Sequence, residues 1–367
     1  MRIIVDSHIP HIQGLIEPRS EVLYLEPGDI TRDAVRDADA LIVRTRTRCD
    51  AALLDGSRVR FIGSATIGTD HIDLDYCATH GITVRNAPGC NAPAVAQWIF
   101  AAIAAWMNAR EISPSSVASR HLPPGGGGVN PDGLTLGIVG VGHIGSIVAR
   151  WATQLGFTVL LNDPPRENRD DSHDVVFSPL DELQRRCDII TFHTPLTRDG
   201  QWPTWHLCDQ RFLDGLTRCR LILNAARGPI ADNTALLRWH GDVALDCWEN
   251  EPHISTELLE KAVVATPHIA GYSLQGKQRG TAMMLAALNE FYGWDIPIPA
   301  IASPATGAQD NSPSSVASRH LPPGGGGVSL DGIAASYDIL ADTARLKAAP
   351  ATFEFQRNHY PHRQEYQ

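Results

Sequence analysis

The chain has 367 residues, with 31 basic and 41 acidic side chains and a formal net charge of −10. The length predicts two domains, since a domain commonly has roughly 100–200 residues. The acidic balance excludes the basic surface that general nucleic-acid binding requires, although it leaves room for a local basic pocket.

The N-terminus, MRIIVDSHIP, reaches Asp6 without a long apolar stretch, so we expect no secretory signal. The longest apolar run, at residues 94–107, is too short to span a bilayer and predicts a buried helix. The 7 cysteines show no C-x-x-C spacing, which is typical of reduced thiols. We therefore expect a cytoplasmic protein that binds neither a membrane nor a nucleic acid.

Short β-branched runs alternate with helical patterns along the chain. Strands are first expected at residues 2–5, 22–25, 40–43, 61–62 and 82–84, followed by a long apolar helix at 92–109. A second series of strands is expected at 135–139, 158–161, 188–192, 221–224, 243–245 and 263–265, with helices such as 144–155, 180–186 and 233–239 between them. This alternation predicts two α/β domains, each with a parallel sheet covered by helices on both faces.

One segment, SPSSVASRHLPPGGGGV, occurs letter for letter at residues 113–129 and again at 312–328. Proline pairs and runs of glycine disfavour both helix and strand, so the two copies are predicted to be flexible inserts. A basic ligand-binding loop built on the Ser-Arg-His core is the alternative interpretation.

A glycine motif follows the strand expected at 135–139. Gly140, Gly142 and Gly145 form G-x-G-x-x-G at the start of a helical pattern. In this context the first glycine permits a tight turn, the second lets backbone N–H groups approach a pyrophosphate, and the third lets helix and strand pack closely. The helix N-terminus adds free donors and a partial positive charge. The motif therefore predicts a dinucleotide-binding domain.

The kind of dinucleotide is indicated by Asp163, which ends the next strand in the sequence T-V-L-L-N-D. A carboxylate at this position accepts hydrogen bonds from the ribose hydroxyls and repels a 2′-phosphate, which favours NAD over NADP. Arg166 and Arg169 follow closely and leave NADP as the alternative, because an arginine can bind such a phosphate.

Three polar clusters follow the ends of later strands, where ligands bind in open parallel sheets. They contain Arg227, Glu251 and His268. Oxidation of a secondary alcohol beside a carboxylate needs a base, which His268 can supply, and a partner such as Glu251 that orients the imidazole. Arg227 can bind the carboxylate through its forked guanidinium. Taken singly, each residue also has a structural explanation, as an ion pair, a helix cap or a buried histidine.

The order of these motifs resembles the D-2-hydroxyacid dehydrogenases. It comprises the glycine motif, N-A-A-R-G at 224–228, D-x-W-E-x-E-P at 246–252 and T-P-H-I-A-G at 266–271. The resemblance implies a Rossmann-type doubly wound parallel sheet domain, a flavodoxin-like α/β substrate-binding domain and a short C-terminal α+β dimerisation region. The expected bounds are 130–271 for the NAD-binding domain, 1–110 and 272–299 for the substrate-binding domain, and 300–367 for the dimerisation region.

Within this family, the chain is most similar to the branch that oxidises 4-phosphoerythronate. G-S-A-T-I-G-T-D-H-I-D at 63–73, A-P-G-C-N-A at 87–92 and H-I-A-G-Y at 268–272 carry the resemblance. It implies NAD-dependent oxidation of 4-phospho-D-erythronate to 2-oxo-3-hydroxy-4-phosphobutanoate, a step toward pyridoxal phosphate, in a homodimer. The alternatives are phosphoglycerate oxidation, reduction of glyoxylate or hydroxypyruvate, and a non-catalytic NAD-sensing protein.

The resemblance also assigns roles to single residues. The implied catalytic set is Arg227, Glu251 and His268, with His268 as the proton carrier. Cofactor contacts are implied at Gly140, Gly142, His143, Ile144, Gly145, Asp163, Thr194, Asp246 and Gly271. Substrate contacts are implied at Thr45, Thr66 and Tyr272, and no metal is expected.

The phosphate of such a substrate needs a basic partner. Arg44, Arg46 and Arg48 alternate along the sequence and would project from one face if the strand at 40–43 continued. A solvated basic strand end is the alternative interpretation of these residues. The basic residues at 357–363 are the competing candidates for the phosphate.

Overall fold

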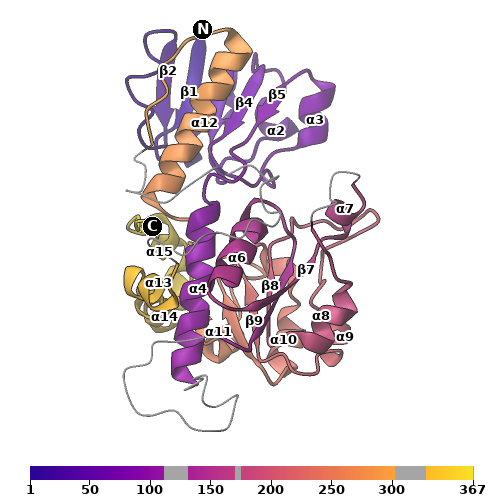
Figure 1. Cartoon of the computed structure of the whole chain (residues 1–367). Helices are drawn as coiled ribbons and strands as arrows, with labels where there is room; N and C mark the ends of the chain where they lie inside the picture. Colours follow the sequence, from indigo (N-terminus) through magenta and orange to yellow (C-terminus); the bar gives the residue numbers. More distant parts are fainter. Residues whose placement is uncertain (111–130, 170–174, 302–327, 367) are drawn as a thin grey trace. The chain divides into compact units, whose positions relative to one another are not determined.

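The structure of the chain is a computed structural model that describes residues 1–110, 131–169, 175–301 and 328–366. The chain divides into two compact units, which Figure 1 shows coloured along the sequence. Unit 1 comprises Met1–Asn91 and Ser273–Ser303, and unit 2 comprises Ala92–Tyr272 and Pro304–Gln367. Both copies of the duplicated segment lie outside the described residues, apart from Val328.

Unit 1 is built on a five-stranded sheet with the order β2-β1-β3-β4-β5. Its strands, all parallel to their neighbours, are β1 (Arg2–Asp6), β2 (Glu21–Leu25), β3 (Ala40–Val43), β4 (Phe61–Ser64) and β5 (Thr83–Arg85). Its helices are η1 (Pro27–Asp29), α1 (Arg32–Val35), α2 (Ala51–Leu54), α3 (Leu74–Thr79) and α12 (Leu274–Tyr292). This strand order is the flavodoxin-like one, in which ligands bind at the carboxyl ends of the strands.

The sheet of unit 1 is covered on both faces. Met284 and Leu288 of α12 pack with Phe61 of β4 in one buried cluster. Leu53 of α2 packs with Leu41 of β3 in another. The central strands β1, β3 and β4 are therefore buried on both sides, which explains why their sequences are largely continuous apolar runs rather than alternating ones.

Unit 2 is built on a six-stranded parallel sheet with the order β11-β10-β9-β8-β6-β7. Its strands are β6 (Thr135–Val139), β7 (Thr158–Asn162), β8 (Ile189–Phe192), β9 (Leu221–Asn224), β10 (Asp242–Leu245) and β11 (Val264–Ala265). Its longer helices are α4 (Ala92–Ala109), α6 (His143–Gln154) and α14 (Ile339–Ala348). The strand order reverses between β6 and β8, the switch point at which doubly wound sheets bind their ligands.

Short helices join the strands of unit 2 and form its C-terminal segment. Between the strands lie α7 (Pro164–Glu167), α8 (Leu180–Arg186), α9 (Gln210–Asp214), η2 (Gly228–Ile230), α10 (Asn233–Arg238) and α11 (Thr256–Lys261). After the last strand come α13 (Leu330–Ser336), η4 (Pro350–Thr352) and α15 (Phe353–Asn358), with α14 between the first two. The predicted α/β fold class, with helices packed against parallel sheets, is confirmed in both units.

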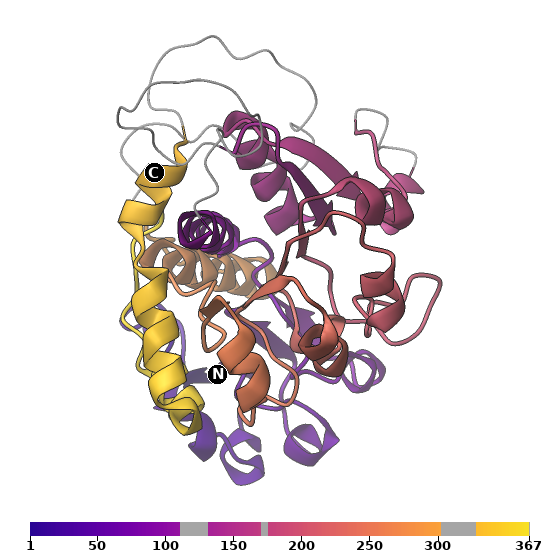
Figure 2. The same ribbon diagram turned by 90° about the horizontal axis from the view of Figure 1, so that it is seen from below.

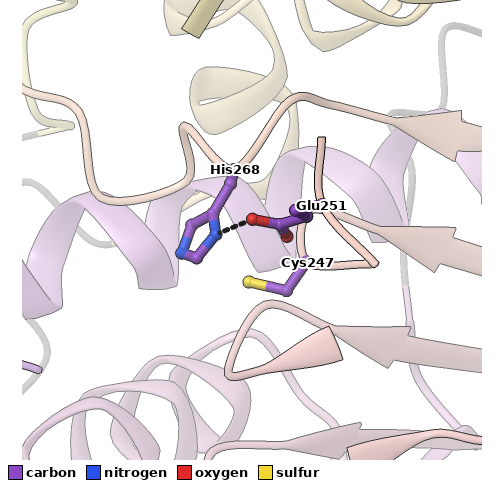
Figure 3. Close-up of side chains that lie close together, drawn as sticks. All are labelled: Cys247, Glu251 and His268. Atoms are coloured by element: carbon purple, nitrogen blue, oxygen red, sulfur yellow. Dashed lines mark hydrogen bonds and ion pairs between the residues drawn. The ribbon is translucent and has the colours of Figure 1, made fainter. Parts of the chain in front are cut away.

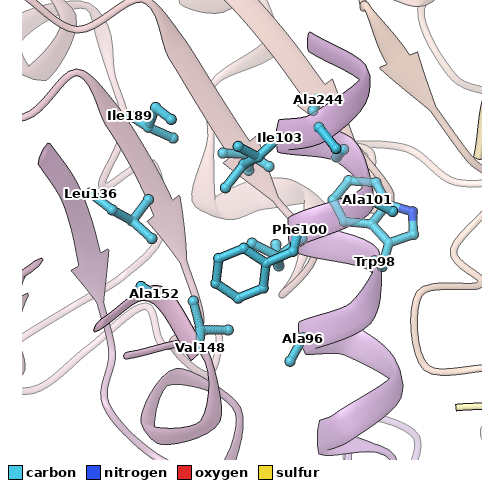
Figure 4. Packing of buried hydrophobic residues seen from close by; sticks show 14 of the residues in the cluster. Ala96, Trp98, Phe100, Ala101, Ile103, Leu136, Val148, Ala152, Ile189 and Ala244 are labelled. Carbon is cyan, nitrogen blue, oxygen red and sulfur yellow. The ribbon is translucent and has the colours of Figure 1, made fainter. Parts of the chain in front are cut away.

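The long apolar helix α4 belongs to unit 2, so the boundary lies at Asn91 and Ala92 instead of the expected residue 110. Its Phe100 and Ile103 lie in one buried cluster with Leu136 and Ile189 of the sheet (Figure 4). Among the described residues, α4 is the one helix long and apolar enough to cross a membrane, and it is mostly buried within unit 2. A core helix that is apolar all round has the same composition as a membrane span.

The C-terminal segment also belongs to unit 2, in place of the separate region expected at 300–367. Ile333 of α13 shares a buried cluster with residues of α4, and Figure 2 shows the C-terminal helices in yellow beside that helix. The Thr343 hydroxyl of α14 accepts a hydrogen bond of 3.1 Å from the Ala265 N–H of β11. Residues 328–366, the described part of this segment after residue 301, are helical, and the α+β character expected for the whole region stays a prediction.

Candidate active site

The glycine motif forms a tight turn at the switch point of unit 2. Gly140 has a φ of +88°, and a Cβ there would lie 2.8 Å from the carbonyl carbon of His193. A Cβ on Gly145 would lie 2.0 Å from the Gly140 oxygen. Gly142 faces open space and begins α6 without a side-chain cap, so the first-turn N–H groups at His143 and Ile144 are left for an anion.

Asp163 holds this turn from the end of β7. One carboxylate oxygen accepts the Val141 N–H at 2.7 Å, and the other accepts the Arg166 N–H at 3.0 Å. Each oxygen keeps a second lone pair, which is what hydrogen bonds from two ribose hydroxyls require. The Arg166 guanidinium donates to the Val141 carbonyl at 2.6 Å, so it lies at the same turn.

Two buried polar atoms beside the glycine motif have no hydrogen-bond partner among the described residues: His193 Nδ1 and Thr194 Oγ1. Burial lowers the pKa of His193 to about 3, so its imidazole is neutral there. Buried polar atoms are nearly always paired, and orphaned ones at a ligand-binding edge indicate that a ligand completes them. The open glycine turn, Asp163 and these two atoms together fit a dinucleotide.

Asp246 anchors the turn that carries His268. It ends β10 with 1% of its surface exposed, and burial raises the pKa of its carboxyl above the ordinary value. One oxygen accepts the Thr266 hydroxyl at 2.6 Å and the Ile269 N–H at 2.7 Å, and the other accepts the Ala270 N–H at 3.0 Å. In the described structure this carboxylate fixes the 266–270 backbone, and the cofactor contact implied for it stays a prediction.

Glu251 and His268 form a hydrogen-bonded pair in unit 2 (Figure 3). His268 Nδ1 lies 2.8 Å from Glu251 Oε2, and the other carboxylate oxygen accepts the Trp248 N–H at 2.8 Å. The side chain of His268 is 27% exposed and that of Glu251 is 18% exposed, so solvent reaches both although they are largely buried. Burial alone would raise the pKa of Glu251, but His268 and Arg357 outweigh it and hold it below its ordinary value.

His268 adopts a left-handed backbone with a φ of +56°. Such a conformation costs a non-glycine residue on the order of 1 kcal/mol and persists where the surroundings impose it. Here the His268 N–H donates to the Asp246 carbonyl at 2.8 Å, and the following two N–H groups donate to the Asp246 carboxylate. These hydrogen bonds therefore hold the backbone in the conformation that directs the imidazole toward Glu251.

Arg227 lies near the segment that carries Glu251 because the next residue, Gly228, has no side chain. A Cβ on Gly228 would lie 1.9 Å from the Trp248 carbonyl oxygen, so only glycine lets the two segments approach. The Arg227 guanidinium donates to the Ala226 carbonyl at 2.7 Å. Burial raises the pKa of the Cys247 thiol, Glu251 raises it further, and Arg227 lowers it. Glu251 and Arg227 therefore both lie near enough to Cys247 to act on its thiol.

Cys247 lies beneath the pair, with its sulfur, a Glu251 oxygen and a His268 nitrogen within 4.8 Å of one another (Figure 3). Thiolate, carboxylate and imidazole are the ligands that zinc prefers. The guanidinium groups of Arg227 and Arg357 act on the same thiol and disfavour a second cation there. The expectation of no metal stays a prediction.

Arg357 of α15, one of the basic residues at 357–363 considered above for the phosphate, lies in this cluster, a position that the motifs did not reveal. Its Nη1 lies 3.8 Å from Glu251 Oε2, and its guanidinium donates a hydrogen bond to the Tyr272 hydroxyl. The side chain is only 17% exposed. Burial would lower the pKa of Arg357, but the charges of Tyr272 and Glu251 hold it above the ordinary value. The sequence signal was a single basic residue far along the chain from Glu251, which no local spacing could place.

The substrate residues predicted in unit 1 lie at the carboxyl edge of its sheet. Thr45 is exposed on the loop after β3, and Thr66 follows β4 with its hydroxyl 2.8 Å from that of Ser64. The expected alternation of Arg44, Arg46 and Arg48 does not occur, because β3 ends at Val43 and a turn follows. Arg44 donates to the His8 carbonyl at 3.1 Å, whereas Arg48 pairs with Asp50 at 2.6 Å.

Residues 101–270 match the family model for the NAD-binding domain of D-isomer specific 2-hydroxyacid dehydrogenases. An erythronate-4-phosphate dehydrogenase of Bacteroides thetaiotaomicron is 40% identical over 375 residues, which cover 100% of this chain and 97% of the relative. The chain belongs to the D-2-hydroxyacid dehydrogenase family, in its erythronate-4-phosphate dehydrogenase branch. Its dinucleotide is therefore NAD, and the family assignment argues against the NADP alternative.

Further members of the family support the assignment. An erythronate-4-phosphate dehydrogenase of Bacteroides fragilis is 42% identical over 371 residues, with 100% of this chain and 97% of the relative covered. Among solved structures, a Thermus thermophilus protein is 28% identical with a TM-score of 0.65, over 82% of this chain and 99% of that protein. The resemblance first seen in the motifs is confirmed as family membership.

Proposed function

We propose that this dehydrogenase oxidises 4-phospho-D-erythronate to 2-oxo-3-hydroxy-4-phosphobutanoate in the synthesis of pyridoxal phosphate. The observation that carries the proposal is the 2.8 Å pair of Glu251 and His268 in a chain 40% identical, over its whole length, to an erythronate-4-phosphate dehydrogenase. When bound, NAD supplies the hydride acceptor. Unit 2 is its binding domain, and unit 1 contributes Thr45 and Thr66 to the substrate.

The proton and the substrate carboxylate are assigned to three side chains of unit 2. With Glu251 ionised and bonded to Nδ1 of His268, that nitrogen carries the proton and Nε2 is left as the base for the substrate hydroxyl. Arg227 binds the carboxylate next to the reacting carbon and polarises the developing carbonyl oxygen. His268 and Arg357 together hold the pKa of Glu251 below its ordinary value and so keep it in its charged form, and Tyr272, which Arg357 fixes, contacts the substrate.

The substrate and its competitors are separated by one assay. Purified protein is given NAD with 4-phosphoerythronate, 3-phosphoglycerate, D-glycerate or D-lactate, and NADH formation is followed by absorbance. We expect 4-phosphoerythronate to have the highest kcat/KM. A higher value for 3-phosphoglycerate or an unphosphorylated acid would refute the named substrate, and NAD binding without turnover of any acid would favour the NAD-sensing alternative.

A cytoplasmic homodimer is the proposed assembly. Leu340 of α14 and Phe355 of α15 are large apolar side chains exposed on the C-terminal helices, where a partner subunit would cover them. Light scattering on the purified protein is expected to give twice the chain mass. Replacement of both residues by serine is expected to yield monomers, and a wild-type monomer would contradict the assembly.

A further inference from the structure

Lys277 lies on α12, on the side of this helix that faces the carboxyl edge of the unit 1 sheet. One turn further on, the Thr281 hydroxyl donates a hydrogen bond of 2.8 Å to the Pro10 carbonyl, in the segment after β1. A Cβ on Gly280 would lie 2.8 Å from the Ala65 carbonyl oxygen, in the segment after β4. Residues four apart share one face of a helix, so Lys277 lies on the face that meets the end of β1.

Two charged side chains from neighbouring strands act electrostatically on this lysine. Arg44 follows β3, which lies between β1 and β4 in the sheet, and Asp6 ends β1. Burial lowers the pKa of Lys277, Arg44 lowers it as well and Asp6 acts in the opposite direction, which together give a pKa of about 7. A half-buried amine therefore lies near a second cation, and an anion that contacts both groups is attracted by both charges.

Asp6 is a carboxylate that acts on Lys277 from the end of β1. Its side chain is fully buried, and one oxygen accepts the His8 N–H at 2.9 Å. The other oxygen, Oδ2, has no hydrogen-bond partner among the described residues. Lys277 and Arg44 are thus two basic groups at an edge that also carries Thr45 and Thr66.

We propose that Lys277 and Arg44 bind the phosphate group of the substrate at the carboxyl edge of the unit 1 sheet, an assignment that rests on the proposed function. The oxygens of a phosphate dianion accept hydrogen bonds from both a forked guanidinium and an ammonium group, and both cations attract its charge. Binding draws a proton onto the Lys277 amine, since a nearby anion favours its charged form. The site thereby distinguishes phosphorylated from unphosphorylated hydroxy acids.

The test compares Lys277→Gln and Lys277→Arg with the wild-type enzyme on 4-phosphoerythronate and on unphosphorylated D-erythronate. Loss of one charge-assisted contact with phosphate is expected to raise KM for 4-phosphoerythronate by about 10- to 100-fold, with kcat changed less than about threefold. KM for D-erythronate stays within about twofold, because that acid has no phosphate. Lys277→Arg keeps the charge and recovers most of the affinity.

Lys347→Gln is the matched control, since it removes the same charge from unit 2, where Lys347 donates to the Glu260 carbonyl. Far-UV circular dichroism and NADH affinity establish that each variant is folded. Equal increases of KM for both acids, or a fall in kcat alone, would overturn the phosphate assignment and indicate that Lys277 only supports Asp6.

Binding of inorganic phosphate keeps the test independent of turnover. Titration followed by phosphorus NMR is expected to show that phosphate binds the wild type and Lys347→Gln alike, and Lys277→Gln at least about tenfold more weakly. If another acid proves to be the substrate but this difference holds, the named reaction fails and the anion site stands. Equal phosphate affinity in all three proteins would refute the site itself.

Discussion

The carboxyl edges of the two sheets hold their polar groups in opposite ways. In unit 2, Asp246 accepts hydrogen bonds from the Thr266 hydroxyl and two backbone N–H groups, and Glu251 accepts from His268 and Trp248. In unit 1, the charges of Arg44 and of the buried Asp6 act on Lys277. A group that moves a proton must be held in one orientation, whereas recognition of an anion needs cationic groups near one another. We therefore assign chemistry to the edge of unit 2 and propose recognition at the edge of unit 1.

The largest expected effect comes from His268, at the carboxyl edge of the unit 2 sheet. His268→Ala is expected to lower kcat by about 10²–10⁴, the usual contribution of a general base. NADH affinity, measured by fluorescence titration, stays close to the wild-type value because the glycine motif is untouched. An equal loss of NADH affinity would show that His268 is a binding residue and would break the assignment of chemistry to this edge.

The next largest effect is expected at Gly228, where the Arg227 segment packs against the backbone of Trp248. Gly228→Ala places a Cβ where the Trp248 carbonyl oxygen lies, and such overpacking is expected to lower the free energy of unfolding by about 3 kcal/mol. The control is Gly28→Ala in unit 1, where a Cβ meets nothing within 4 Å and the expected change is below about 0.5 kcal/mol.

Urea unfolding measures this contrast for each unit. Of the 8 tryptophans only Trp294 lies in unit 1, so tryptophan fluorescence follows mainly unit 2, and circular dichroism follows both units. A Gly228→Ala protein as stable as the Gly28→Ala protein would show that the Gly228 and Trp248 segments move apart without cost. The close packing inferred for the carboxyl edge of the unit 2 sheet would then be wrong.

A smaller effect is expected from Arg357, which joins the C-terminal helices to the catalytic pair. Arg357 and His268 hold the pKa of Glu251 below its ordinary value against the effect of burial. Arg357→Gln therefore raises that pKa, so Glu251 takes up a proton at a higher pH and the acid limb of the kcat/KM profile moves to higher pH. The expected shift is up to about one pH unit, and kcat/KM near neutral pH changes little because Glu251 stays ionised there.

Arg345→Gln is the matched control for Arg357. Arg345 also lies on the C-terminal helices, but it pairs with Asp342 at 2.8 Å, away from Glu251. Its profile is expected to overlay that of the wild type. If both variants shift alike, the change comes from loosening of the C-terminal segment and has no specific connection with Glu251.

Local patterns in the sequence predicted most elements because local interactions decide them. The strands of both sheets and the turn at Gly140 depend on apolar runs and on a backbone conformation that glycine allows. The position of α4 could not be predicted in this way. Its residues are apolar on every side, so no face indicates which of the two sheets it covers, and the bonds that decide it, such as Trp98 to Thr266, join distant parts of the chain.

The candidate site shows the same limit. Glu251 and His268 are close because each follows a strand of one parallel sheet, which motif order can predict. Arg357 and Lys277 come from helices outside that order, and only tertiary packing places them. The alternation expected at Arg44, Arg46 and Arg48 failed because β3 ends one residue before Arg44 and Cys49 then bridges to Ile72. A pattern of period two has meaning only while the strand continues.

The smallest effect separates recognition from structure within a single loop of unit 1. Thr45 is exposed, whereas Thr47, two residues later, is buried. Thr45→Ala removes one neutral hydroxyl contact with the substrate and is expected to raise KM by about two- to tenfold without changing kcat, while Thr45→Ser restores the wild-type value. Thr47→Ala is expected to leave KM unchanged and to alter only the melting temperature. If instead Thr47→Ala raises KM and Thr45→Ala does not, the loop acts through its internal packing, and recognition at this edge belongs to the charges of Lys277 and Arg44 alone.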